Sequence, residues 1–172
     1  QRQGNYMVFY PSYRLMEDVL QVYEEEFSVD WVRCVCQTPD MTEQEREGFL
    51  EEFQEREGTL VGFCVLGGIF SEGVDLTGES LIGAVIVGTG LPQIGSQREI
   101  LKEYYDKKNH CGFDYAYRYP GMNKVLQAAG RVIRTKEDKG VILLLDDRFW
   151  DRDYQENFPR EWQDRTGCRL DT

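Results

Sequence analysis

The sequence predicts an α/β fold, a three-layer sandwich in which helices cover both faces of a mostly parallel sheet. Short apolar runs rich in β-branched residues, which predict buried strands, alternate along the chain with segments of helical periodicity. Such β-α units connect parallel strands through helices that pack on the sheet. The chain has 172 residues and is 41% hydrophobic, which indicates one domain over residues 1–172 and excludes a disordered chain.

Strands and helices are expected to alternate along most of the chain. The expected strands are residues 5–10, 31–36, 59–66, 81–88 and 141–145. The expected helices are residues 12–27, 42–57, 96–108 and 125–134, with closing helical turns at 148–155 and 159–165. Ser12 is suited to cap the first helix, and Thr42 forms a capping box with Glu45 at the start of the second. The run 141–145, VILLL, has no polar residue and predicts a buried strand.

The segment 127–140 combines a polar helical stripe with an apolar one. At about 100° per residue, one helix face collects Gln127, Gly130, Arg131 and Arg134. The opposite face collects Val125, Leu126, Ala129, Val132 and Ile133, and we expect it to face the core. A glycine within a helix costs about 1 kcal/mol relative to alanine, so Gly130 indicates close approach of a backbone or a phosphate. Two arginines on a rigid support are typical of phosphoryl-transfer sites.

The loop 67–79 lies between two predicted strands and contains four glycines and, among its carboxylates, Glu72 and Asp75. Open α/β sheets bind ligands in loops at the carboxyl ends of their strands. No lysine follows the glycines, so the loop is not a phosphate-binding P-loop. Considered alone, the loop is better interpreted as a turn whose glycines only permit positive φ.

Together these segments resemble the DinG/XPD-type superfamily 2 helicases. Residues 67–92 resemble motif V of this family, residues 127–140 resemble motif VI, and residues 5–13 resemble motif IV. Residues 146–149 and 154–159 resemble the end of the domain. The resemblance implies a RecA-like fold, of the P-loop NTPase type, and the second motor domain of an ATP-dependent DNA helicase.

The resemblance also implies roles for individual residues. Arg134 would be the arginine finger, Arg131 would help to hold the γ-phosphate, and Gln127 would orient neighbouring groups. The ATP-binding residues expected on this basis are Glu72, Gly73, Asp75, Gln127 and Gly130. The two carboxylates would couple the nucleotide site to the nucleic-acid track, where Ser12 and Thr89 are expected to contact backbone phosphates.

The chain contains no G-x-x-x-x-G-K-[ST] sequence and no acidic motif of the type that holds magnesium. It also begins at Gln1, so we expect a fragment of a longer chain. ATP and Mg²⁺ would then be shared with an N-terminal motor domain, and the fragment alone should not hydrolyse ATP. An iron–sulfur cluster, which some members of the family carry, would lie outside this fragment.

The net charge of -11 opposes nucleic-acid binding, since phosphate contacts need clustered Lys and Arg. However, the predicted helix 42–57 alone contains seven Glu and two Arg, and we interpret it as a solvated face turned away from DNA. The domain alone should therefore bind single-stranded DNA weakly. No apolar run reaches the roughly 18 residues of a membrane span, so we expect no membrane contact and a cytoplasmic location.

Aromatic and basic residues are interleaved in the segment 104–119. Such rings can stack on the bases of a single strand. They can also pack a long connection against the domain, and this interpretation is favoured because the segment precedes motif VI and must position it.

Three functions remain open from the sequence. The first is a helicase motor half, and the second is the same domain in a DinG-type nuclease that ATP regulates. The third is a degenerate module that senses nucleotide or binds a partner. The presence of Asp75, Gln127, Arg131 and Arg134 counts against the third.

Overall fold

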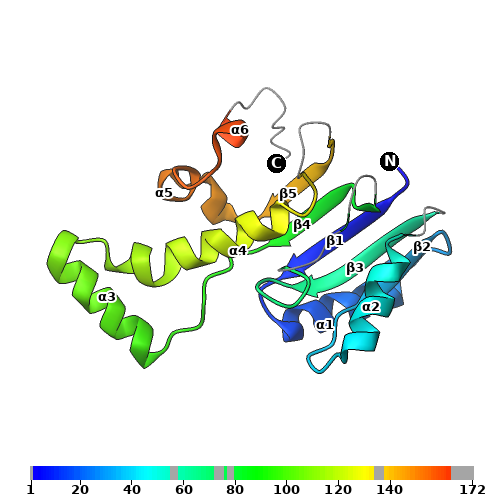
Figure 1. Cartoon of the computed structure of the whole chain (residues 1–172), viewed down its shortest axis with the longest axis horizontal. Helices are drawn as coiled ribbons and strands as arrows, with labels where there is room; N and C mark the ends of the chain where they lie inside the picture. Colours follow the sequence, from blue (N-terminus) through cyan, green and yellow to red (C-terminus); the bar gives the residue numbers. More distant parts are fainter. Residues whose placement is uncertain (1, 55–57, 72–75, 77–79, 134–137, 164–172) are drawn as a thin grey trace.

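The structure is a computed structural model of the chain, and it describes residues 2–54, 58–71, 76, 80–133 and 138–163. Five strands form one sheet in the order β2-β3-β1-β4-β5 (Figure 1). They are β1 (Asn5–Tyr10), β2 (Val32–Cys36), β3 (Thr59–Val65), β4 (Gly83–Val87) and β5 (Val141–Leu145). All neighbouring strands are parallel, which confirms the predicted α/β class.

The helices follow the predicted order, with shorter bounds in several places. They are α1 (Tyr13–Val22), α2 (Glu43–Glu52), α3 (Ser96–Asn109), α4 (Tyr119–Ala129), α5 (Arg152–Gln155) and α6 (Arg160–Gln163). The π-helical turns η1 (Tyr23–Phe27) and η3 (Asp114–Arg118) adjoin α1 and α4, and the 3-10 turn η4 (Asp147–Trp150) follows β5. Within the described residues, no helix has the length and apolar character needed to cross a membrane.

Both predicted helix caps are present. The Ser12 hydroxyl accepts a hydrogen bond from the Leu15 amide at 3.3 Å, at the start of α1. At the start of α2, the Thr42 hydroxyl accepts from the Glu45 amide, and the Glu45 carboxylate accepts from the Thr42 amide at 2.7 Å. This backbone hydrogen bond lowers the pKa of Glu45. Local sequence therefore determines where these two helices begin.

Helices cover both faces of the sheet, as the three-layer prediction requires. On one face, Phe53 at the end of α2 and Val125 of α4 are fully buried in a large apolar cluster with strand residues. On the other face, Met16 of α1 is fully buried in a smaller cluster that includes Phe63 of β3.

Strand β5 forms an edge of the sheet, and the prediction of a buried strand is wrong here. Ile142 and Leu144 pack against the large core, but Val141, Leu143 and Leu145 are 55%, 49% and 54% exposed. Helix α1 packs over β1 and β3 on that face, so it leaves β5 uncovered by the described residues. An apolar run indicates a strand but cannot reveal whether that strand lies at an edge of the sheet.

Helix α4 ends at Ala129, earlier than the sequence predicts. Gly130 is its C-cap residue, with φ -65° and ψ -5°. The amides of Arg131 and Val132 then donate to carbonyls three residues earlier, at 3.2 and 3.1 Å. This tighter turn brings Val132 into the core, where it is 3% exposed. The polar stripe expected on one helix face is therefore divided, with Gln127 on the helix and Arg131 beyond it.

Helix α3 and the segment leading into α4 form an arm that extends away from the sheet (Figure 1). Aromatic rings join its two sides. Tyr105 stacks on Tyr115 with ring centroids 3.9 Å apart, while Tyr104 and Tyr119 meet these rings edge-on. Most of the rings are thus paired within the arm, which supports the packing interpretation of the segment 104–119.

Candidate functional site

The loop that follows β3 turns at two glycines, at the carboxyl edge of the parallel sheet. Gly67 has a φ of 72°, in the left-handed region that favours glycine. A Cβ atom on Gly68 would lie 2.7 Å from Gln37 Nε2 and 2.9 Å from the Val65 carbonyl oxygen. Both residues therefore have a structural reason to be glycine, whatever else the loop does.

Ser71 fixes the shape of this turn. Its side chain is fully buried, and its hydroxyl donates to the Val65 carbonyl at 3.1 Å and accepts from the Gly67 amide at 3.0 Å. Both the donor and an acceptor position of the hydroxyl are thus used within the turn. The carbonyl oxygen of Ser71 remains available to another element.

That element is the chain just beyond α4. Nε and Nη2 of Arg131 donate to the Ser71 carbonyl at 3.2 and 2.9 Å. The two residues are 60 positions apart in the sequence. Hydrogen bonds from a guanidinium are stronger than those between neutral groups. The two segments that resemble motifs V and VI therefore meet at the carboxyl edge of the sheet.

Gln37 joins a third element to the same turn, and sequence reasoning missed it. It directly follows β2 and is only 1% exposed. Its Oε1 accepts from the Val65 amide at 3.0 Å, and its Nε2 donates to the Tyr13 hydroxyl at 2.7 Å. Burial raises the pKa of Tyr13, while the bond to Gln37 opposes that rise. The position of Gln37 directly after a predicted strand was the available signal.

Thr89 lies on the loop after β4, between two glycines of positive φ, Gly88 at 80° and Gly90 at 66°. It is 1% exposed, and its hydroxyl has no hydrogen-bond partner among the described residues. The loop packs closely on α4, since a Cβ atom on Gly121 would lie 2.6 Å from the Thr89 carbonyl oxygen. In this conformation the hydroxyl that we expect to contact phosphate is inside the protein.

The other predicted site residues fall into two groups. Ser12, Gln127 and Gly130 are exposed, the first as the N-cap of α1 and the others at the end of α4. Glu72, Gly73, Asp75 and Arg134 lie outside the described residues.

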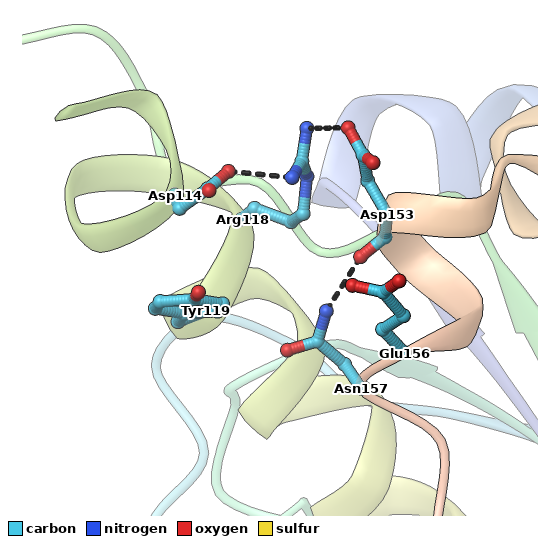
Figure 2. Close-up of a pocket in the computed structure, with 6 residues that line it drawn as sticks. All are labelled: Asp114, Arg118, Tyr119, Asp153, Glu156 and Asn157. Carbon is cyan, nitrogen blue, oxygen red and sulfur yellow. Dashed lines mark hydrogen bonds and ion pairs between the residues drawn. The ribbon is translucent and has the colours of Figure 1, made fainter. Parts of the chain in front are cut away.

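A separate cluster of charged residues surrounds a cavity of about 290 Å³ at the start of α4 (Figure 2). Its centre is Arg118, which pairs with Asp114 at 2.5 Å and with Asp153 of α5 at 3.0 Å. The eleven residues of α4, about 16 Å of helix, separate this cluster from the end near Arg131. The cavity therefore marks the joint between the arm and the C-terminal turns. Within the described part of the chain, no group of three His, Cys, Asp or Glu side chains could hold a metal ion.

This architecture is that of a RecA-like helicase domain: a parallel sheet covered on both faces, with its carboxyl-edge loops joined by an arginine from a neighbouring helix end. The chain belongs to the helicase C-terminal domain family, whose model matches residues 1–165.

Sequence relatives agree with this assignment. The chain is 28% identical over 178 residues to the regulator of telomere elongation helicase 1 homolog of Drosophila persimilis, covering 95% of this chain and 17% of the relative. The homolog from Culex quinquefasciatus is 30% identical over 161 residues, covering 85% of this chain and 16% of that protein. The chain thus spans about a sixth of the length of these relatives.

Solved structures show the same fold. An XPD helicase superposes with a TM-score of 0.70 at 25% identity, covering 91% of this chain and 27% of that one. An apo XPD structure gives a TM-score of 0.69 at 24% identity, covering 90% and 30% of the two chains. The DinG/XPD-type resemblance and the RecA-like fold are thereby confirmed.

Proposed function

We propose that this domain is the second motor half of an ATP-dependent DNA helicase, supplying arginines to an ATP cleft and part of a single-stranded DNA track. The observation that supports this most directly is the contact between Arg131 and Ser71. It brings motif VI onto the motif V turn at the edge of the sheet where open α/β folds bind ligands.

In this proposal ATP lies between this domain and an N-terminal motor domain of the same chain. Arg134 acts as the arginine finger, and Arg131 engages the γ-phosphate when the cleft closes. Glu72, Gly73, Asp75, Gln127 and Gly130 complete the nucleotide side of the cleft. In this proposal the ligands of Mg²⁺ come from the other domain.

The nucleic-acid track is proposed to follow the same edge of the sheet. Ser12 is exposed at the start of α1, where helix amides favour an anion. Thr89 would reach a phosphate only after the loop between Gly88 and Gly90 moves, and two residues of positive φ suit such a hinge.

The proposal is tested by ATP hydrolysis of the full-length protein with and without single-stranded DNA, comparing wild type with Arg134→Ala. An arginine finger accounts for roughly 10³- to 10⁵-fold in turnover, so DNA-stimulated hydrolysis should nearly vanish in the variant. Arg152→Ala is the matched control, because Arg152 is 87% exposed and pairs locally, with Glu156 at the end of α5.

Two outcomes would contradict the proposal. Wild-type turnover in Arg134→Ala would exclude this residue as the finger. No hydrolysis in either protein would favour the degenerate sensing or interaction module. DNA cleavage that depends on ATP would instead identify the DinG-type nuclease.

A further inference from the structure

A series of hydrogen bonds, linked through the covalent structure of Val65 and Ser71, crosses the carboxyl edge of the sheet from α1 to the end of α4. It starts at the Tyr13 hydroxyl and passes through the Gln37 amide to the backbone of Val65. From the Val65 carbonyl it continues through the Ser71 hydroxyl, and the Ser71 carbonyl finally accepts from Arg131. We call these residues the edge network.

The buried members of the edge network have little freedom to move independently. Gln37 and Ser71 are 1% and 0% exposed, and their side-chain bonds are all to other members of the network or to Gly67. The Gln37 amide also lies directly against Gly68, where a Cβ atom would be only 2.7 Å away. A shift of the Gln37 amide must therefore displace the turn or break its hydrogen bonds.

The two ends of the edge network, in contrast, reach partly exposed positions with different proposed roles. Tyr13 is half-buried and is the first residue of α1, next to the exposed Ser12. At the other end, Arg131 is half-buried, and it is one of the residues proposed to engage the nucleotide. The edge network thus joins a proposed nucleic-acid contact to a proposed nucleotide contact through the protein interior.

We propose that Tyr13 and Gln37 are positioning residues that couple nucleic-acid binding at the start of α1 to the placement of Arg131. Binding there shifts the Tyr13 hydroxyl, Gln37 transmits the shift to the turn, and the Ser71 carbonyl releases or re-aims the Arg131 guanidinium. This inference rests on the proposed function and assigns its regulation to two residues outside the proposed catalytic and ATP-binding set.

The test removes one hydrogen bond and leaves the rest of the edge network in place. Tyr13→Phe deletes the hydroxyl that accepts from Gln37 and keeps the ring. Tyr6→Phe is the matched control, because the Tyr6 hydroxyl donates to the Arg2 carbonyl, outside the edge network. ATP turnover of the full-length protein is measured without nucleic acid and with saturating single-stranded DNA, together with the KM for ATP and the thermal unfolding of each variant.

In Tyr13→Phe we expect the ratio of DNA-stimulated to basal turnover to fall about two- to tenfold, the range of one hydrogen bond's net contribution. The fall should persist at saturating DNA, and Tyr6→Phe should keep the wild-type ratio.

Three results would overturn the coupling role while leaving the motor function intact. The ratio could stay at the wild-type value in Tyr13→Phe. Basal and stimulated turnover could fall by the same factor, as they would for a purely structural residue. The loss could also vanish at saturating DNA, as it would for a simple DNA contact. A wild-type protein without any stimulation would instead overturn the proposed function, and the coupling with it.

Discussion

Two buried hydroxyls at the carboxyl edge of the sheet differ in their hydrogen bonding. The Ser71 hydroxyl both donates and accepts within the motif V turn. The Thr89 hydroxyl is as deeply buried but has no partner among the described residues. An unsatisfied buried hydroxyl costs about 1–3 kcal/mol, so a threonine at this position is unfavourable for folding alone. A use in a second conformation, such as a phosphate contact, would account for it.

We therefore expect Thr89→Val to have opposite effects on stability and on function. Valine has nearly the same shape and no hydroxyl to desolvate, so the free energy of unfolding should rise by about 1 kcal/mol. Single-stranded DNA binding by the full-length protein should weaken, because the proposed phosphate contact is lost. Thermal unfolding and fluorescence anisotropy measure the two effects, with Thr89→Ser as the variant that keeps the hydroxyl. A less stable Thr89→Val protein would mean that the hydroxyl is satisfied in the folded state.

A second residue-scale prediction concerns alkaline pH. Burial, with smaller contributions from Cys36 and Cys34, raises the pKa of Tyr10 from 10.0 to about 12. Below pH 10 the phenol is protonated in both folded and unfolded chains, and its contribution to stability is complete. Between pH 10 and about 12 the unfolded chain loses the proton first, so the free energy of unfolding should fall.

Tyr10→Phe should reduce this alkaline loss, because phenylalanine has no phenolic proton to lose. The substitution keeps the ring that stacks on Phe63, with ring centroids 5.8 Å apart. Urea unfolding at intervals from pH 8 to pH 12 provides the measurement. An unchanged pH profile in Tyr10→Phe would show that other groups cause the loss.

At the scale of elements, the sequence predicts best what depends on local pattern. Helix starts at Ser12 and Thr42 depend on one side chain and the next turn, and both are present as predicted. The end of α4 depends instead on Val132 reaching the core, and the exposure of β5 depends on strand order. The link between Gln37 and Tyr13 likewise needs β2 and the start of α1 to be brought together by the sheet. Such facts come from packing between distant segments, which periodicity does not record.

Contact between elements also predicts a difference between two glycine substitutions. Gly121 lies in the first turns of α4, where a Cβ atom would meet the Thr89 carbonyl at 2.6 Å and the Leu91 amide at 3.1 Å. Gly121→Ala should separate α4 from the loop after β4 and lower stability by about 1–3 kcal/mol. Gly48 lies on the exposed side of α2, where an added methyl group would have no atom within 4 Å, so Gly48→Ala should raise stability by about 0.5–1 kcal/mol.

Urea unfolding of the two proteins compares the same chemical change in two settings. Equal effects of the two substitutions would show that helix propensity, rather than the contact with the loop, decides the outcome.

At the scale of the whole molecule, the distribution of charge indicates how much of a binding surface this domain can provide. The chain has a net charge of -11, and α2, which covers one face of the sheet, carries five Glu and one Arg. The described residues among those proposed to meet ATP and DNA are few, and they lie after β1, after β4 and at the end of α4. Under the proposed function, such a domain would supply a small set of positioned groups to a cleft and a track that a second domain completes, rather than a whole binding surface.

It follows that this domain alone should bind single-stranded DNA weakly. Non-specific binding by a complete basic surface gives a Kd of about 10⁻⁴–10⁻⁶ M at physiological salt, and we expect this chain to lie at or beyond the weak end of that range. Few phosphates would be neutralised, so the plot of log Kd against log salt should be shallow. Fluorescence anisotropy at several salt concentrations measures both quantities.

Glu47 and Glu51 are exposed on α2. The double variant Glu47→Gln with Glu51→Gln should leave the affinity nearly unchanged if that face is turned away from DNA. Micromolar binding with a steep salt dependence would show that this domain contains a complete DNA track, and marked tightening in the double variant would place the acidic face beside the strand.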